Sequence, residues 1–516
     1  KGMVRSDFIH IPKFKDKPRT SKPPAAEKHR VVIVGGGPVG LSLALDLGKR
    51  GVSVVLLNQF DFIPGGSKGI CYSKRTLDIW NRLGVAHSML SKGVQWNLGK
   101  VFRGANPDPI YEFDLLPIKD QEMPAFINLQ QYYVEDFLVD AVEATEAVDL
   151  RWGHRVIGLD AERRLLSIET EDGEYEIEAD WIVACDGSKS SIRSMMGLSF
   201  EGRVFEDNFL IADIKINQSR DAERWFWFEP PWPGASALMH RQPDDIWRLD
   251  FQLGWDIDRE AAVRPENVEP FVRGMLGDDI EFEREWYSVY TFQCRRMKRF
   301  VHGRIIFAGD AAHLVSPFGA RGANSGVADA DNLGWKLAHV LAGGDQSIIE
   351  TYNAEATFAA DENILNSTRS TDFLTPKSSV SRSFRDAVLD LSEHYDFARP
   401  FVNSGRLSMA VSYSEGPLAV PDEDTWESGV IPGAPALDAP LNGGWLLNQL
   451  GGEWKLITGG TAIDAPIPVL EVASDLAKER FSLEAGCAYL IRPDQYVAGR
   501  WKNFSPEKLE TFAWLL

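Results

Sequence analysis

The chain contains few cysteines, and none of them are closely spaced. Four occur in 516 residues, with no CxxC motif: Cys71, Cys185, Cys294 and Cys487. Zinc motifs and disulfide scaffolds both need clustered cysteines, so neither is indicated. We therefore expect no metal site, and we expect the protein to reside in the reducing cytoplasm.

Positive charge is also scarce. Lysine and arginine together number 55 against 75 aspartates and glutamates, which gives a net charge of −20. Nucleic acids and anionic membrane surfaces are bound through basic patches, so neither partner is expected. No charge-free apolar run reaches the length of about 18 residues that a membrane helix needs. Residues 1–29 lack the apolar centre of a signal peptide and are expected to form an extended arm.

The familiar motifs of protein-based catalysis are missing as well. There is no HExxH motif and no recognisable Ser/His/Asp arrangement. A protein nucleophile or a catalytic zinc is therefore not indicated.

A βαβ unit with a glycine-rich turn opens the packed part of the chain. VVIV (31–34) is predicted to be a buried strand, GGGPVG (35–40) the turn, and LSLALDLGKRG (41–51) the helix before a second strand, VSVVLL. Gly35 permits the tight turn, Gly37 lets a pyrophosphate approach the backbone, and Gly40 lets the helix pack on the strand. An acidic residue is expected after the second strand, but Asn58 and then Gln59 stand there.

The segment RIIFAGDAAHLVSPFGARGANSGVADADNLGWKL (304–337) carries the most information. It predicts a strand that ends at Gly309-Asp310, a loop rich in glycine and proline, and then a helix. A carboxylate at the end of a strand can accept hydrogen bonds from a polyol chain. The helix N-terminus favours negative charge, as a reduced flavin requires.

These motifs closely resemble those of the FAD-dependent aromatic hydroxylases, the single-component flavoprotein monooxygenases. GDAAH, GxNxG and DxxNLxWKL match the second flavin motif of that family, and Asp186-Gly187 after the strand WIVAC matches its DG motif. Lys68 stands where the family often has arginine, and Gln131 and Glu135 match its glutamine–glutamate spacing. The resemblance implies these cofactor-binding residues: Gly35, Gly37, Pro38, Gly40, Asn58, Gln59, Lys68, Gln131, Asp186, Gly187, Gly309, Asp310, Pro317, Gly322, Ala323 and Asn324.

The resemblance implies an α/β fold of the p-hydroxybenzoate hydroxylase type, in the branch of phenol hydroxylase and 3-(3-hydroxyphenyl)propionate hydroxylase. A dinucleotide-binding FAD domain would carry an inserted antiparallel-sheet substrate domain and be followed by a thioredoxin-like α/β domain. The expected divisions are an arm (1–29), the FAD domain (30–199 and 296–400), the substrate sheet (200–295), a linker (401–444), and the thioredoxin-like domain (445–516), which has no CxxC.

The resemblance also implies the reaction. NAD(P)H would reduce FAD, O2 would form a flavin hydroperoxide, and a small phenolic substrate would be hydroxylated. With only one GxGxxG in the chain, NAD(P)H is expected to bind transiently rather than in a domain of its own. A homodimer is a further expectation.

Residues 200–298 are rich in aromatic side chains with strand-like alternation, as in AERWFWFEPP and IWRLDFQLGW. Candidates for a base that removes the phenolic proton are His240, Tyr287 and Tyr290, each of which has a structural role as its alternative. Pro317 is expected to position the ring environment through its carbonyl group. Candidate substrate-binding residues are Trp227, Arg241, Arg248, Phe251 and Phe318.

Two alternatives stay open. The first is a flavin enzyme of the same fold with other chemistry: oxidative denitration of a nitrophenol, epoxidation, or halogenation. WFWFEP (225–230) partly resembles the WxWxIP motif of flavin-dependent halogenases, although Glu229 replaces the isoleucine. The second alternative is a non-catalytic flavin-binding protein.

Overall fold

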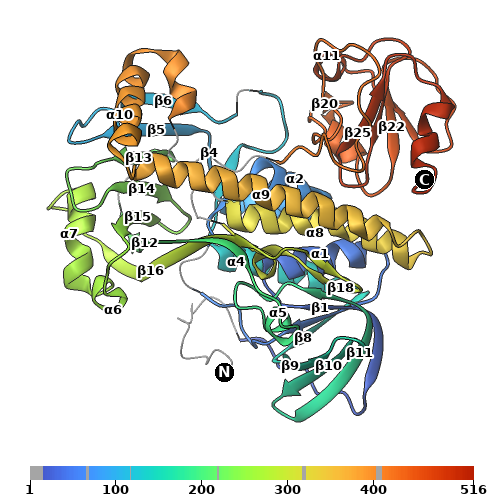
Figure 1. Ribbon diagram of the computed structural model, residues 1–516, viewed down its shortest axis with the longest axis horizontal. Helices are drawn as coiled ribbons and strands as arrows, with labels where there is room; N and C mark the ends of the chain where they lie inside the picture. The colour runs from blue at the N-terminus through green and yellow to red at the C-terminus, as the bar shows by residue number, and fades with distance from the viewer. Residues whose placement is uncertain (1–15, 66–68, 117, 218–219, 316–320, 403–409) are drawn as a thin grey trace.

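The computed structural model describes residues 16–65, 69–116, 118–217, 220–315, 321–402 and 410–516. The chain forms a mixed α/β fold with several sheets, as expected (Figure 1). Two sheets of eight strands each dominate it. A smaller sheet near the C-terminus belongs to a unit that stands apart in Figure 1.

The first large sheet is built around parallel strands that are almost entirely apolar. β1 (Glu27–Val34) pairs in parallel with β2 (Val54–Asn58) and β11 (Gly173–Ala184). Central parallel strands are covered on both faces, which explains runs such as VVIV. The order is β17-β18-β11-β1-β2-β8, and β10 and β9 extend it from β11. The remaining strands are β8 (Val148–Trp152), β9 (Arg155–Asp160), β10 (Leu165–Thr170), β17 (Val301–His302) and β18 (Ile305–Phe307).

Three helices pack together beside this sheet. α1 (Pro38–Lys49) lies between α4 (Gln131–Glu143) and α8 (Arg321–Leu341), as Figure 1 shows. The helix predicted after the glycine-rich turn is thereby confirmed. Smaller elements of this part are β3 (Cys71–Ser73), α2 (Lys74–Arg82), α3 (Ala86–Lys92), β4 (Val94–Trp96), β7 (Phe126–Asn128), α5 (Ser191–Met195) and η2 (Gly309–Ala311).

The aromatic segment forms the second large sheet, whose order is β19-β16-β12-β15-β14-β13-β5-β6. Its predicted antiparallel strands are confirmed. β5 and β6 were not expected in it, because β5 joins β13 in a parallel pairing between segments far apart in the sequence. The strands are β5 (Leu98–Arg103), β6 (Tyr111–Asp114), β12 (Glu201–Lys215), β13 (Arg224–Phe228), β14 (Ser236–Arg241), β15 (Ile246–Gly254), β16 (Glu283–Arg296) and β19 (His313–Leu314).

The two faces of this second sheet are covered differently. On one face, Trp247, Leu249 and Phe251 pack with residues of α7 (Pro265–Leu276), which follows α6 (Arg259–Ala262). On the other face, Phe226 and Leu238 pack with residues from the end of α9 and from α10. Because strand side chains alternate, each strand contributes to both cores. The elements on the second face are α9 (Ile348–Leu374), α10 (Ser379–His394) and η3 (Asp396–Phe401).

The C-terminal unit contains a four-stranded sheet with the order β23-β22-β24-β25. Its core includes Val430, Ala436 and Ala439, so the end of the segment predicted as a linker packs within this unit. The last element of the unit is a 3-10 helix. The elements are β20 (Pro440–Leu441), β21 (Gly444–Trp445), η4 (Leu446–Gln449), β22 (Lys455–Thr458), β23 (Val469–Glu471), α11 (Asp475–Phe481), β24 (Ala488–Ile491), β25 (Val497–Trp501) and η5 (Pro506–Phe512).

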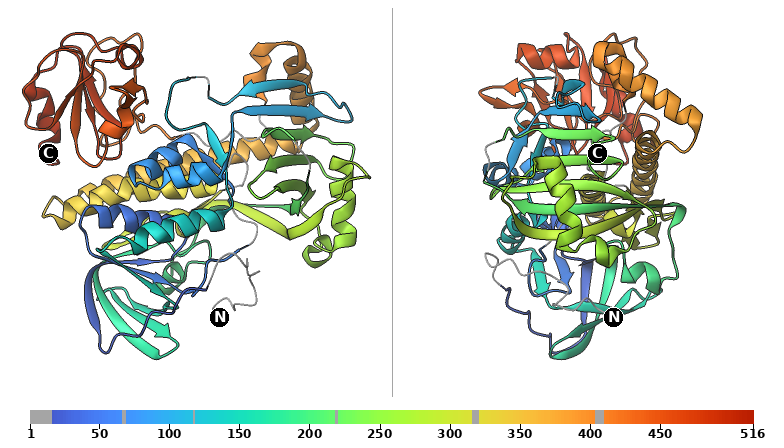
Figure 2. Two further views of the ribbon diagram at one scale, coloured as in Figure 1. Left: turned by 180° about the vertical axis from the view of Figure 1, so that it is seen from behind. Right: turned by 90° about the vertical axis from the view of Figure 1, so that its left-hand side faces the viewer.

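A buried ionic network attaches the C-terminal unit to the helices of the first part. Glu355 of α9 accepts hydrogen bonds from Lys336 Nζ at 2.6 Å and from Arg492 Nη1 at 2.6 Å. Asp494 in turn accepts from Arg492 Nη2 at 2.7 Å and from Trp335 Nε1 at 3.0 Å. We call Trp335, Lys336, Glu355, Arg492 and Asp494 the junction network. Figure 2 shows the unit against these helices and away from the second large sheet.

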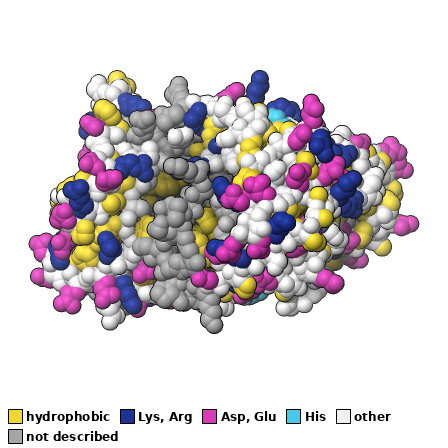
Figure 3. Space-filling model, turned by 90° about the horizontal axis from the view of Figure 1, so that it is seen from below, with side chains coloured by type: hydrophobic (Ala, Val, Ile, Leu, Met, Phe, Trp, Pro, Cys, Tyr) yellow, Lys and Arg dark blue, Asp and Glu magenta, His cyan; other side chains and the backbone are white. Residues whose placement is uncertain are grey.

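Among the described residues, no helix is both long and apolar enough to cross a membrane. All four cysteines are buried and free. On the face drawn in Figure 3, acidic and basic side chains are interspersed rather than gathered by sign.

Candidate active site

The glycine-rich turn closes against the DG segment. Gly35 has φ +115°, and a Cβ atom there would lie 2.1 Å from the carbonyl oxygen of Cys185. At Gly40 a Cβ atom would lie 2.0 Å from the carbonyl oxygen of Gly35. Only glycine fits either position, so α1 begins tightly against the ends of β1 and β11. Pro38 occupies the first turn of α1, where no N–H partner is needed.

The DG segment forms a second turn at the same edge. Asp186 Oδ2 accepts hydrogen bonds from Ser191 Oγ and from the backbone N–H of Ile192, both at 3.3 Å. Asp186 Oδ1 is buried and has no hydrogen-bond partner among the described residues. Burial raises the pKa of Asp186, although those hydrogen bonds act in the opposite direction. Gly187 follows with φ +82°.

The strand end at Gly309-Asp310 lies beside both turns. A Cβ atom at Gly326 of α8 would lie 2.6 Å from Val39 Cγ2 and 3.4 Å from Gly309 Cα, so α8, α1 and the end of β18 converge. Arg193 of the DG segment donates to the carbonyl oxygen of Ala311 at 2.8 Å. The three flavin motifs therefore meet at one edge of the parallel sheet.

Two residues of the long motif hold this edge in place. The Asp329 carboxylate accepts from the backbone N–H of Gly309 at 2.9 Å and contacts His313 Nε2 at 2.5 Å. Burial lowers the pKa of His313, but the pairing with Asp329 outweighs burial and leaves it raised. Asp310 has solvent-exposed surface, but the protein that surrounds its carboxyl group raises the pKa of that group.

Asn324 and Gln131 link α8 to the strand β3. Asn324 Oδ1 accepts from Thr76 Oγ1 at 2.6 Å and from the backbone N–H of Ser73 at 3.0 Å, and its Nδ2 donates to the Cys71 carbonyl oxygen at 3.1 Å. The side chain of Asn324 is thus engaged with protein groups. Gln131 Oε1 accepts from the backbone N–H of Gly69, which lies close to Ala323.

Asn58 is buried at the end of β2, where the prediction placed a ribose contact. Its Oδ1 accepts the backbone N–H of Phe60 at 3.0 Å, and its amide packs against Gly36. Gln59 is exposed and lines a surface cavity of about 410 Å³ with Arg19, Asp61 and Arg155. Lys68, Pro317 and Phe318 lie outside the described residues.

The residues present fit FAD. A Cβ atom at Gly37, Gly187 or Gly322 would meet nothing within 4 Å, so the backbone is open at all three positions. The N-termini of α1 and α8 supply backbone N–H groups without intrahelical partners, which suit phosphate and an anionic ring. The unpartnered Asp186 Oδ1 offers an acceptor to a hydroxyl or N–H of the cofactor.

Tyr290 brings the second sheet to this edge. Its side chain is 43% exposed, and its pKa is raised to about 12, first by burial and then by the charge of Asp310. Tyr290 on the aromatic sheet and Asp310 in the flavin motif therefore lie close enough to interact electrostatically. A hydroxyl with this pKa keeps its proton at neutral pH, so Tyr290 can donate a hydrogen bond but is a poor base.

A buried polar cluster lies on the same face of the sheet. Arg248 Nε donates to Asp213 Oδ1 at 2.9 Å, and His240 Nδ1 lies 3.9 Å from Cys71 Sγ. Burial, with the charges of Arg224 and Arg248, holds the pKa of His240 well below its usual value. We call Cys71, Asp213, Arg224, His240, Arg248 and Asp250 the sheet cluster.

Four predicted residues lie on the opposite face of the sheet. Trp227, Phe251 and Tyr287 pack in the core that includes α7, and Arg241 stands two positions after Met239, on the same face as that core. The alternation of strands β13 to β16 therefore turns these four side chains to the face away from Tyr290.

Sequence reasoning missed Asp250, Arg224 and Cys71. Asp250 stands two positions after Arg248 on β15, so alternation alone would have placed both on one face. Arg224 and Cys71 come from strands whose pairings join distant segments, and no local pattern indicates that they meet. Among the described residues, no cluster suited to a metal ion is present.

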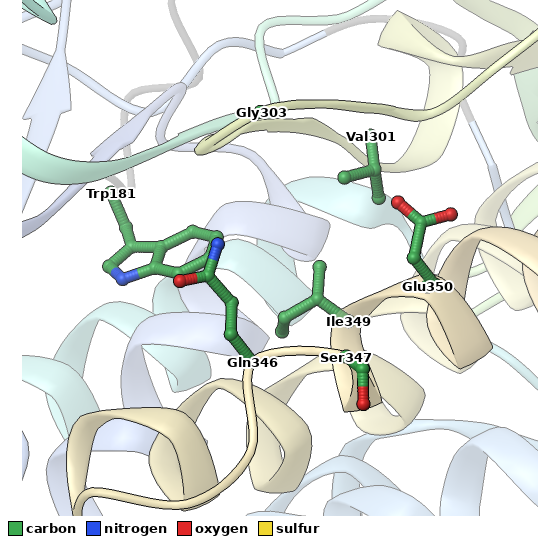
Figure 4. A pocket seen from close by; sticks show the side chains of 7 residues that line it. All are labelled: Trp181, Val301, Gly303, Gln346, Ser347, Ile349 and Glu350. Carbon is green, nitrogen blue, oxygen red and sulfur yellow. The ribbon is translucent and has the colours of Figure 1, made fainter.

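One further cavity, of about 250 Å³, lies away from all of these groups (Figure 4). It is formed by the turn between β17 and β18 and by the start of α9, at the end of β18 remote from Asp310. None of the predicted site residues lines it. Its walls are Trp181, Val301, Gly303, Gln346, Ser347, Ile349 and Glu350.

Comparison with known proteins agrees with this geometry. Residues 28–367 match the family model described as FAD binding domain. This match covers more than half of the chain, which therefore belongs to that family. The prediction of FAD as cofactor is confirmed, as are the resemblance to the flavin-dependent aromatic hydroxylases and the enzyme class of flavin-dependent monooxygenase.

Two relatives and one solved structure illustrate the similarity. A probable NADH-specific resorcinol 4-hydroxylase of Rhodococcus jostii (strain RHA1) is 31% identical over 344 residues, covering 65% of this chain and 64% of that protein. A 3-(3-hydroxy-phenyl)propionate/3-hydroxycinnamic acid hydroxylase of Mycolicibacterium gilvum (strain PYR-GCK) is 29% identical over 400 residues, covering 75% and 67%. The crystal structure of the flavin-dependent monooxygenase PieE with FAD and substrate has a TM-score of 0.76 at 22% identity, covering 92% and 96%, and shares the fold.

Proposed function

We propose that this protein is an FAD-dependent monooxygenase that hydroxylates a phenolic aromatic ring with NAD(P)H and O2. The observation that carries the proposal is the pairing of β16 with β19, Arg296 opposite His313, which joins the aromatic sheet to the flavin motif. The names of the relatives, which specify resorcinol and hydroxyphenyl substrates, support a phenol as substrate class.

The residues divide the work between cofactor and substrate. The turn at Gly35 to Gly40, the DG segment and the N-terminus of α8 would hold FAD, which supplies the redox chemistry that activates oxygen. Asp310 would accept hydrogen bonds from the polyol chain of the cofactor. Tyr290 would donate a hydrogen bond at the edge of the site, and the apolar wall around Leu238 would exclude water from the ring.

The division into domains is also part of the proposal. An FAD domain, an inserted substrate sheet and a C-terminal unit of thioredoxin type fit the cores around β1, around β15 and around Tyr489 and Ile491 of β24, and the other face of β24 joins the core of β1 through Leu490. The absence of CxxC from the sequence leaves the C-terminal unit without dithiol chemistry. The expected homodimer stays a prediction, which light scattering after gel filtration would test.

The test is NAD(P)H oxidation by the FAD-loaded protein with a panel of phenols, hydroxybenzoates and nitrophenols. Strong stimulation by one phenol, with a product about 16 mass units heavier, is expected for transfer of one oxygen atom. Loss of nitrite from a nitrophenol would instead indicate denitration. The proposal fails if no phenol stimulates oxidation of either nicotinamide cofactor.

A further inference from the structure

Asp250 lies on the face of the second sheet that turns toward the FAD part of the chain. On β15, Trp247, Leu249 and Phe251 point into the core with α7, so Arg248 and Asp250 point to the other side. Asp250 is paired with Ile211 of β12. Two positions before Ile211 on β12, Phe209 is paired with Tyr290, on the same face as Asp250.

The surroundings of Asp250 combine an apolar wall and charged groups. Leu238 is its partner on β14, and Leu238 is in turn paired with Phe226 on β13, within one apolar core. The negative charge of Asp250 acts to raise the pKa values of Arg224, Arg248 and Cys71. An aromatic ring with a polar substituent needs this combination of an apolar surface and a few directed polar groups.

The Asp250 carboxylate is not used elsewhere in the described part of the chain. It makes no hydrogen bond or ion pair with any described residue, and it keeps some contact with solvent. The neighbouring Asp213, by contrast, binds Arg248 through two contacts of 2.9 and 3.1 Å. A half-buried carboxylate without a protein partner, beside two guanidinium groups, is an acceptor that faces a ligand site.

We propose that Asp250 is the general base that removes the phenolic proton of the substrate. This inference rests on the proposed function and assigns one residue to its proton transfer. The O–H bond of the phenol breaks, and its proton forms a new O–H bond on the Asp250 carboxylate. The electron pair stays on the phenolic oxygen, which makes the ring carbons more nucleophilic.

The transfer conserves the charge of the sheet cluster. Before it, the guanidinium groups of Arg224 and Arg248 face the carboxylates of Asp213 and Asp250. After it, the negative charge of Asp250 has moved to the phenolate, which faces the same two cations. No uncompensated charge is created in a buried site, so the large cost of such a charge is avoided.

The ionisation of Asp250 supports this role. Burial raises its pKa to about 7, and Asp213 acts in the same direction, while Arg248 and Arg224 act against it. A base is most effective when its pKa is near the working pH. His240 is a weaker candidate, because burial and the same two arginines depress its pKa. Cys71 keeps its proton, since burial raises its pKa to about 12.

The first test measures a bound phenol rather than turnover. 4-Nitrophenol is titrated with pH while bound to oxidised holoenzyme, and its phenolate is followed by absorbance. A carboxylate beside the phenol opposes a second negative charge, so Asp250→Asn should lower the apparent pKa of bound nitrophenol by about one unit or more. The matched control is Asp245→Asn, an exposed residue in the turn before β15, which should leave it unchanged.

The second test is the pH profile of kcat/KM for the best phenol. The wild type should gain activity as Asp250 loses its proton near pH 7, whereas Asp250→Asn should lack this limb and be slower by about 100-fold. If the variant keeps both the limb and the pKa of bound nitrophenol while the wild type hydroxylates phenols, only this inference is overturned. If the wild type hydroxylates no phenol, the proposed function fails, and the nitrophenol titration still reports whether Asp250 faces the ligand.

Discussion

Two of the buried groups of charges in the described part of the chain differ in how completely their members are paired. In the junction network, the Glu355 carboxylate is bound by Lys336 and by Arg492, and Asp494 is bound by Arg492 and Trp335. In the sheet cluster, Arg248 and Asp213 pair while Asp250 has no partner among the described residues.

The pKa values of Glu355 and Asp250 follow this difference in pairing. Burial raises the pKa of both, but Arg492 and Lys336 reverse its effect on Glu355 and lower that pKa to about 2. At Asp250 the nearby arginines do not outweigh burial, and the pKa stays at about 7. A fully paired buried charge serves attachment, whereas an incompletely paired one is available for chemistry.

The largest expected effect comes from breaking the junction network. Glu355→Gln removes the anion between Lys336 and Arg492 while keeping the shape of the side chain. Leaving buried cations without their partner should lower the free energy of unfolding by about 3–5 kcal/mol, measured by urea denaturation of the holoenzyme.

The control lies on the same helix. Glu350 binds Arg299 at 2.8 Å, but its side chain is 59% exposed, so Glu350→Gln should cost about 1 kcal/mol or less. Equal losses in the two variants would contradict a special role for the buried network.

Lowering the pH should reduce the contribution of the junction network to the free energy of unfolding. The folded pKa of Glu355, about 2, lies below its ordinary value of 4.5, so its contribution is present above pH 4.5 and disappears as the pH falls toward 2. The wild type should lose up to about 3 kcal/mol of unfolding free energy across this window from Glu355. Glu355→Gln should show a flatter acid limb, and an unchanged limb would place the acid sensitivity elsewhere.

Asp250→Asn should have the opposite effect and raise the free energy of unfolding. The folded pKa of Asp250, about 7, lies above its ordinary value of 3.8, so ionisation costs stability progressively as the pH rises from about 4 to 7. The variant should be more stable than the wild type by about 1–2 kcal/mol at pH 8, with no gain near pH 4. Thermal unfolding at both pH values, with Asp245→Asn as control, measures this gain; a loss at pH 8 would mean that Asp250 stabilises the fold.

The sequence predicted one region better than the other for a physical reason. Gly35, Asp186 and Asp310 belong to short strand–turn–helix segments, so their local pattern is enough to place them at the ends of parallel strands. Trp227 and Tyr290 depend on which face of a strand points to the cofactor. Aromatic residues occupy both faces of this sheet, so composition did not distinguish them.

The same limit applies to the junction network. Lys336 stands in the motif DxxNLxWKL, which predicted a helix, and α8 forms there. Its partners Glu355 and Arg492 come from another helix and from the C-terminal unit, and no spacing in the sequence indicates the contact. Local motifs identify the strand ends that are predicted to bind the cofactor. Contacts between segments that are distant in the sequence decide which buried charges find a partner.

The smallest expected effect distinguishes His240 from Asp250 within the sheet cluster. His240 contacts Cys71 and packs edge-on against Trp96, and its depressed pKa keeps it neutral at working pH. His240→Gln should therefore cost about 1 kcal/mol of stability from altered packing and leave the limb near pH 7 in place. Because Asp250 remains in that variant, a lost or shifted limb in the pH profile of kcat/KM would assign the titrating group to His240. An unchanged limb, together with its loss in Asp250→Asn, would leave the unpaired carboxylate as the group that titrates.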